Sequence, residues 1–163
     1  MKEVSLPTTA EAVVGALKAA ALRKDWDQVD ALAPLAAKMN GDELVAVLYR
    51  STRDTSDDIR DAAMTAWSFL EPTTDEKRTA HFQRALNVMK ADYHECSAIW
   101  AAATVVRYVD DERFGREARG ALSEFKRRIG LMDRNERGED WQETRNFVVG
   151  KNRERLPQLA KFI

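Results

Sequence analysis

The chain has 163 residues, a length typical of one domain, and it carries a net charge of −1. Apolar residues make up 44% and charged residues 33% of it, with few glycines and prolines, which suits long helices with solvated outer faces. The near-neutral charge excludes the strongly basic composition of a typical nucleic-acid-binding domain.

A single cysteine, Cys96, excludes an intramolecular disulfide and suits a reducing compartment. The first residues show no apolar segment of a secretory signal. The longest apolar stretch, 96–106, has about half the length that a membrane-spanning helix needs. We therefore expect a cytoplasmic protein with no membrane segment.

Apolar residues recur at helical spacing along most of the chain, and no segment combines a strand period with hairpin turn signals. This pattern predicts an all-α fold of about seven to nine helices. The predicted helices cover residues 10–23, 26–39, 43–52, 57–70, 74–91, 94–109, 112–129 and 140–149.

Capping residues mark the starts of these helices. Thr8 with Glu11, and Thr73 with Glu76, have the spacing of a capping box, in which a hydroxyl accepts a hydrogen bond from a free backbone N–H group. The other predicted N-caps are Asp25, Asp42 and either Ser56 or Asp57.

Two predicted helices have unusual compositions. Pro34 lies inside the helix at 26–39, and because its surroundings favour helix on both sides, we expect a kink rather than a break. The helix at 94–109 is apolar on most of its sides, which is typical of a central helix that is covered all round.

We expect a single helical-repeat domain over residues 1–163. Its segment 130–139 is charged and predicts an exposed loop. The C-terminal tail, 151–163, is apolar enough to dock as a helix, and a mobile tail is the alternative.

One segment has a specific chemical pattern. From Asp57 to Leu70 the chain shows an acidic turn, the aliphatic–arginine pair Ile59-Arg60, the paired alanines Ala62-Ala63 and an aliphatic end. This pattern resembles the second helix of a HEAT repeat, and residues 43–49 suit the first helix. Small residues in such a helix allow a close approach to its partner.

The resemblance to HEAT repeats is best for residues 42–70 and weaker for 73–109, where Ala98-Ile99 replaces the aliphatic–arginine pair. It implies a short right-handed α-solenoid of antiparallel helix pairs. An irregular helical bundle with one fortuitous match is the alternative.

The sequence shows no constellation that predicts catalysis or metal binding. Segment 92–96 holds a histidine and the only cysteine, but a zinc site needs a second pair of ligands, and His81 is the only other histidine. Cys96 and His94 lie two positions apart, which places them on different faces of a helix. There is neither a glycine-rich phosphate loop nor an HExxH motif. We therefore expect no catalytic residue, metal or cofactor. An enzyme whose site follows no familiar pattern is a further alternative to the binding functions considered below.

Charge is distributed unevenly along the chain. Residues 1–112 carry 13 basic and 19 acidic side chains, whereas residues 113–155 carry 12 basic and 8 acidic ones. Such an imbalance is typical either of a binding surface or simply of a solvated face. The candidate interaction surface consists of Arg113, Arg116, Arg119, Lys126, Arg127, Arg128 and Trp141.

The tryptophans differ in their surroundings. Trp67 and Trp100 lie on apolar stripes and are predicted to be core residues. Trp26 and Trp141 flank charged residues, which favours a surface role.

These features favour a non-enzymatic protein–protein interaction module, such as an adaptor, regulator or inhibitor. The helical-repeat resemblance implies a curved surface, and the charge distribution implies a polarised one. The expected partner is another protein. The alternative is binding of nucleic-acid phosphates through the basic segment 113–155.

Overall fold

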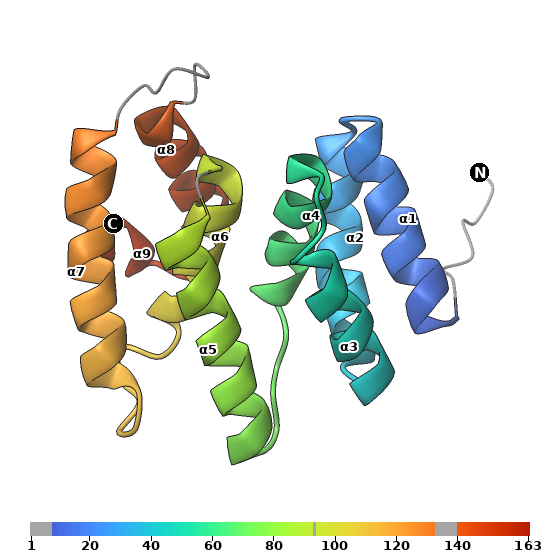
Figure 1. The fold of residues 1–163 in the computed structure, drawn as a ribbon, viewed down its shortest axis with the longest axis horizontal. Helices are drawn as coiled ribbons and strands as arrows, with labels where there is room; N and C mark the ends of the chain where they lie inside the picture. Colours follow the sequence, from blue (N-terminus) through green and yellow to red (C-terminus); the bar gives the residue numbers. More distant parts are fainter. Residues whose placement is uncertain (1–7, 93, 133–139) are drawn as a thin grey trace. The chain divides into compact units, whose positions relative to one another are not determined.

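The computed structural model describes residues 8–92, 94–132 and 140–163. Within these ranges it contains nine α-helices and no strand, which confirms the predicted all-α class (Figure 1). The helices are α1 (Ala10–Leu22), α2 (Trp26–Met39), α3 (Asp42–Ser51), α4 (Asp57–Trp67), α5 (Asp75–Ala91), α6 (Glu95–Val106), α7 (Gly115–Leu131), α8 (Trp141–Lys151) and α9 (Leu159–Phe162). The solenoid arrangement and the antiparallel pairing stay predictions.

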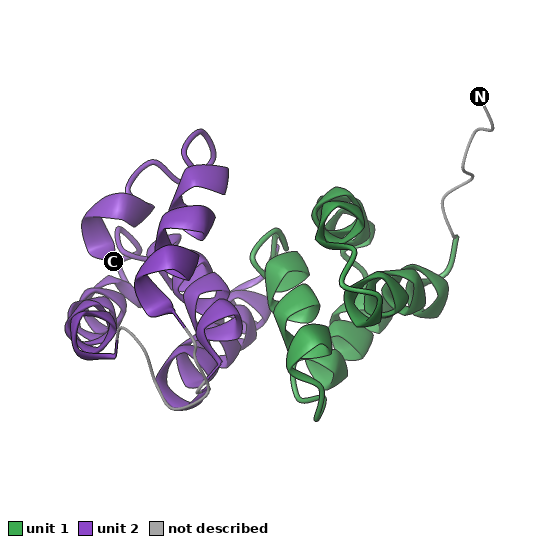
Figure 2. Ribbon diagram, turned by 90° about the horizontal axis from the view of Figure 1, so that it is seen from above, with its two compact units in different colours: residues 1–72 green, residues 73–163 purple. Residues whose placement is uncertain are grey.

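The contacts of the chain gather into two compact units (Figure 2), and the single domain over residues 1–163 stays a prediction. Unit 1 comprises residues 1–72 with α1 to α4, and unit 2 comprises residues 73–163 with α5 to α9. Each unit has its own buried apolar residues.

Unit 1 is built from four helices, and every pair of them is in contact. Its core includes the predicted stripe of α4, which continues into the turn after that helix. The stripe is buried as expected, and its three alanines allow neighbouring helices to approach closely. Its members are Ile59, Ala62, Ala63, Ala66, Trp67 and Leu70.

The helix boundaries of unit 1 agree with the sequence pattern except at the end of α4, which stops at Trp67 rather than at Leu70. Asp25 caps α2 through a 3.2 Å hydrogen bond from the backbone N–H of Gln28, as predicted. Helix α2 then continues through Pro34 without a break and ends before Asn40, whose left-handed φ of 40° stops it. Ser56 caps α4, which was one of two predicted choices.

Three predicted caps are wrong by one residue. Thr9 caps α1 in place of Thr8, and Thr74 caps α5 in place of Thr73. In each pair both threonines can supply the hydroxyl, so the local pattern does not distinguish them. At α3 the N-cap is Gly41, and the predicted cap Asp42 is the first helical residue.

Helix α6 is the central helix of unit 2, as its composition predicts. It contacts α5, α7, α8 and α9, and all ten residues from Ser97 to Val106 are buried. Trp100, a predicted core residue, is among them.

The C-terminal part of the chain packs onto this central helix. Helix α7 extends to Leu131, so the first residues of the predicted loop at 130–139 are helical, while 133–139 lie outside the described residues. In the tail, Leu159 and Ile163 are buried, and α9 contacts α6 and α7. Within the described ranges, no helix is both long enough and apolar enough to cross a membrane.

Candidate functional site

Helix α7 carries most of the predicted interaction residues. Because a helix turns by about 100° per residue, Arg116, Arg119, Lys126 and Arg127 fall within roughly a third of its circumference. All four side chains are exposed, and so is Arg113, which lies just before the helix. We call these five residues the α7 basic face. Another side of the helix is buried in unit 2 through Ala118, Leu122, Phe125 and Ile129.

Two arginines of the α7 basic face are held by neighbouring acceptors. Arg119 donates from Nε to the carbonyl of Val109 and from its terminal nitrogen to Asp110, each at 2.8 Å. Arg127 forms an ion pair of 2.5 Å with Glu124. The hydrogen bond from Arg127 lowers the pKa of Glu124 and, reciprocally, raises the pKa of Arg127. Both guanidinium groups are therefore already partly neutralised.

The remaining cations of this face form weaker contacts within the chain. Lys126 donates to the carbonyl of Lys161 over 3.4 Å. The guanidinium of Arg113 lies 5.1 Å from the ring centre of Phe114. In the part of the chain that the structure describes, Arg116 makes no ion pair, so its charge is the most available to a partner.

Arg128, also predicted for this surface, is half-buried and faces another part of unit 2. Its terminal nitrogens donate to the carbonyls of Lys90 and Asp92, at 3.1 and 3.5 Å, near the C-terminal end of α5. Its guanidinium lies about 5 Å from the ring centres of Phe125 and Trp141. These contacts join α7 to α5 and α8, so Arg128 stabilises the fold of unit 2.

The prediction that Trp141 lies on the interaction surface is wrong. Its side chain is only 1% exposed and packs against Phe125 in a T-shaped arrangement. Trp141 and Val148 are seven positions apart, so they share the inward side of α8. This spacing is the sequence feature that could have indicated the burial of Trp141. The exposed aromatic of that helix is Phe147, which is 54% exposed and lies 4.6 Å from the ammonium of Lys151.

The start of α7 is positioned by a residue that the sequence did not single out. One carboxylate oxygen of Asp111 accepts hydrogen bonds from the backbone N–H groups of Arg113 and Phe114, at 2.8 and 3.1 Å. Its other oxygen pairs with Arg78 of α5. Burial by itself raises the pKa of Asp111, but these hydrogen bonds and the charges of Arg78 and Arg113 more than offset it and lower the pKa. An ionised Asp111 therefore anchors the α7 basic face to α5.

Aromatic packing supports the same junction. The ring of Phe114 stacks on Phe82 of α5 with centroids 4.7 Å apart, and Tyr108 contacts both rings. The base of α7 is thus packed against aromatic rings, while its outer side is charged and solvated.

No group of three or more histidine, cysteine, aspartate or glutamate side chains in the described ranges is arranged to hold a metal ion. The chain matches no protein-family model, no curated protein and no solved structure. The resemblance of residues 42–70 to a HEAT repeat therefore stays a prediction.

Proposed function

We propose that this chain is a HEAT-like, non-enzymatic protein–protein interaction module whose α7 basic face binds an acidic surface of another protein. The observation that carries the proposal is the row of exposed cations on α7, in which Arg116 has no ion pair among the described residues. Arginine is enriched at protein interfaces because its planar group forms several directed hydrogen bonds at once.

The mixture of charges on α7 favours a protein partner over nucleic acid. Glu117 and Glu124 are exposed on the same helix, and Asp110, which pairs with Arg119, is 83% exposed. A nucleic-acid backbone would bring uniform negative charge against these carboxylates, whereas a protein surface can present cations to them. An adaptor, a regulator or an inhibitor would use such a surface in the same way.

The test compares three forms of the tagged full-length chain in affinity purification from a source lysate. Arg116→Glu combined with Lys126→Glu reverses two charges of the α7 basic face, and Arg153→Glu reverses an exposed charge outside α7. We expect a stoichiometric acidic protein with the wild type and with Arg153→Glu, and its loss with the double variant. Circular dichroism checks that each variant keeps its helical content.

Three results would contradict the proposal. The first is the absence of any stoichiometric protein, and the second is recovery of the same protein in equal amount with the double variant. The third is binding of a labelled DNA duplex in fluorescence anisotropy that weakens steeply with salt and is lost in the double variant, which would support the alternative function. No anisotropy change at low salt would exclude that alternative.

A further inference from the structure

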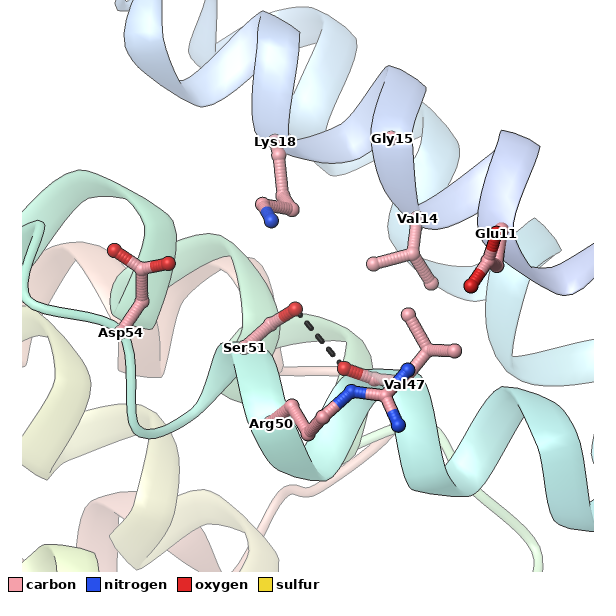
Figure 3. A pocket seen from close by; sticks show the side chains of 8 residues that line it. All are labelled: Glu11, Val14, Gly15, Lys18, Val47, Arg50, Ser51 and Asp54. Carbon is pink, nitrogen blue, oxygen red and sulfur yellow. Dashed lines mark hydrogen bonds between the residues drawn. The ribbon is translucent and has the colours of Figure 1, made fainter.

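Unit 1 contains a pocket of about 300 Å³ between α1 and α3, on a part of the molecule that the α7 basic face does not include (Figure 3). Its floor includes the apolar side chains of Val14 and Val47. Gly15, on its α1 side, is exposed, so the pocket opens to solvent. Because the pocket is open on this side rather than enclosed, a molecule bound in it would keep part of its surface in water.

Four charged side chains surround this floor. Lys18 from α1 and Arg50 from α3 are the cations, and Glu11 and Asp54 are the anions. In Figure 3 the two carboxylates lie at opposite ends of the pocket, and the two cationic side chains lie between them. Among the described residues, neither Lys18 nor Arg50 makes an ion pair. The pocket therefore has a positive middle and negative ends.

The pocket also contains the hydroxyl of Ser51, which does not compete with the two cations for hydrogen bonds to a ligand. The hydroxyl of Ser51 donates to the carbonyl of Val47 over 3.0 Å, so it is already committed as a donor. A ligand in the middle of the pocket would take its hydrogen bonds from the ammonium of Lys18 and the guanidinium of Arg50. Both groups favour an anionic oxygen, and the guanidinium can hold a carboxylate with two parallel hydrogen bonds.

Gly15 lines the pocket on its α1 side. It lies in the middle of α1, where glycine is less favourable than alanine. A Cβ atom built at this position would meet no other atom within 4 Å, so packing does not require glycine there. A longer side chain at Gly15 would extend from this side, beside the groups that line the pocket.

We propose that this pocket binds a linear peptide segment of a protein partner, with one acidic side chain held between Lys18 and Arg50. Basic residues that flank the acidic one would face Glu11 and Asp54 at the two ends. A peptide fits better than a small metabolite because a partly covering pocket leaves a free ligand exposed, whereas a peptide gains further contacts from the protein that carries it. This inference concerns a different surface from the α7 basic face and does not depend on it.

The test is an NMR titration of the ¹⁵N-labelled full-length chain. The probe is a capped pentapeptide with glutamate in the middle and lysine at both ends, and the comparison peptide has glutamine in place of glutamate. The lysines give the probe a net positive charge, which disfavours binding to the α7 basic face. We expect saturable shifts of the amides in α1 and α3 that line the pocket, and at least about tenfold weaker binding of the glutamine peptide.

Four variants of the chain sharpen this test. Lys18→Glu combined with Arg50→Glu should abolish the saturable shifts. Lys38→Glu changes an exposed charge on α2 outside the pocket and should bind like the wild type. Gly15→Met should block the pocket, whereas Gly15→Ala should leave binding unchanged, and both should keep the helical spectrum.

Equal shifts with the glutamate and glutamine peptides would overturn the proposal, as would the absence of saturable shifts. Free glutamate binding as tightly as the capped peptide would also overturn it, since the occupant would then be a small molecule. Shifts confined to α7 would overturn it while leaving the function proposed for the α7 basic face intact.

Discussion

The hydroxyl of Tyr108 and Nδ1 of His81 are joined by a 2.7 Å hydrogen bond inside unit 2. The two side chains are only 4% and 3% exposed, and the ring of Phe82 lies 5.1 Å from that of Tyr108. Which group donates depends on the tautomer of the imidazole. In either case this hydrogen bond is surrounded by aromatic rings. If one of its two side chains is replaced, water cannot reach the other to take over the hydrogen bond.

Replacing Tyr108 by phenylalanine should therefore destabilise the protein while keeping the ring in place. We expect Tyr108→Phe to lower the free energy of unfolding by about 1–3 kcal/mol, because the imidazole loses its hydroxyl partner. Urea denaturation followed by circular dichroism measures this change. A double-mutant cycle with His81→Phe should show a coupling energy of about 0.5–3 kcal/mol, and simple additivity of the two changes would contradict the structure.

The ion pair between Asp111 and Arg78 should make stability depend on pH in the acid range. The hydrogen bonds and charges around Asp111 hold its pKa below the ordinary value of 3.8 in the folded chain, so the unfolded chain takes up the proton more readily. The contribution of Asp111 to stability is thus complete above that ordinary value and is lost as the pH falls through it towards the lowered pKa.

Asp111→Asn should therefore lower the free energy of unfolding by about 1–2 kcal/mol at neutral pH, and its difference from the wild type should shrink on acidification to about pH 3. Urea midpoints at the two pH values measure this. Glu112→Gln removes the neighbouring exposed charge and is the matched control, for which we expect little change. A difference between Asp111→Asn and the wild type that is independent of pH would show that the carboxylate charge is unimportant.

Two glycines of α7 should respond to alanine in opposite directions. At Gly115 a Cβ atom would lie 2.7 Å from the carbonyl oxygen of Val109, so Gly115→Ala should destabilise the protein by about 1–3 kcal/mol. At Gly120 a Cβ atom would meet nothing within 4 Å, and Gly120→Ala should stabilise it by about 0.5–1 kcal/mol through helix propensity. Thermal unfolding of the two variants compares them directly, and a shift of the same sign in both would contradict the close approach at Gly115.

The cap of α5 can be tested with its neighbour as the control. The hydroxyl of Thr74 accepts a hydrogen bond of 3.2 Å from the backbone N–H of Lys77, while Thr73 lies outside the helix. Thr74→Ala should cost about 0.5–2 kcal/mol, and Thr73→Ala should change stability by less than about 0.5 kcal/mol. If urea denaturation showed a larger loss of stability for Thr73→Ala than for Thr74→Ala, the result would support the capping box of Thr73 and Glu76 that the sequence predicts.

The sequence predicted the helices well where strong local signals agree. Helix α2 has the predicted bounds because Asp25 supplies a side-chain cap at its start and the Asn40-Gly41 pair stops it. The apolar stripe of α4 is buried as its spacing predicts. The paired threonines at 8–9 and 73–74 were ambiguous because both members have the same chemistry, and the helix start is set by how the rest of the unit packs.

The candidate site was predictable only in outline. The phase of α7, set by its buried residues, was enough to place Arg116 and Lys126 on the solvent side. The roles of Arg128 and Trp141 depend on which helices meet in unit 2, and local sequence does not contain that information. The ion pair between Asp111 and Arg78 likewise joins residues 33 positions apart, so no local pattern could indicate it.

The burial of α6 on every side has a consequence for amide hydrogen exchange. The backbone N–H groups from Ser97 to Val106 reach water only when the helices that cover α6 separate from it. These amides should therefore be the slowest to exchange in residues 73–163, and they should share one opening free energy. That free energy measures the cooperative unfolding of unit 2 by itself, in the intact chain and without denaturant.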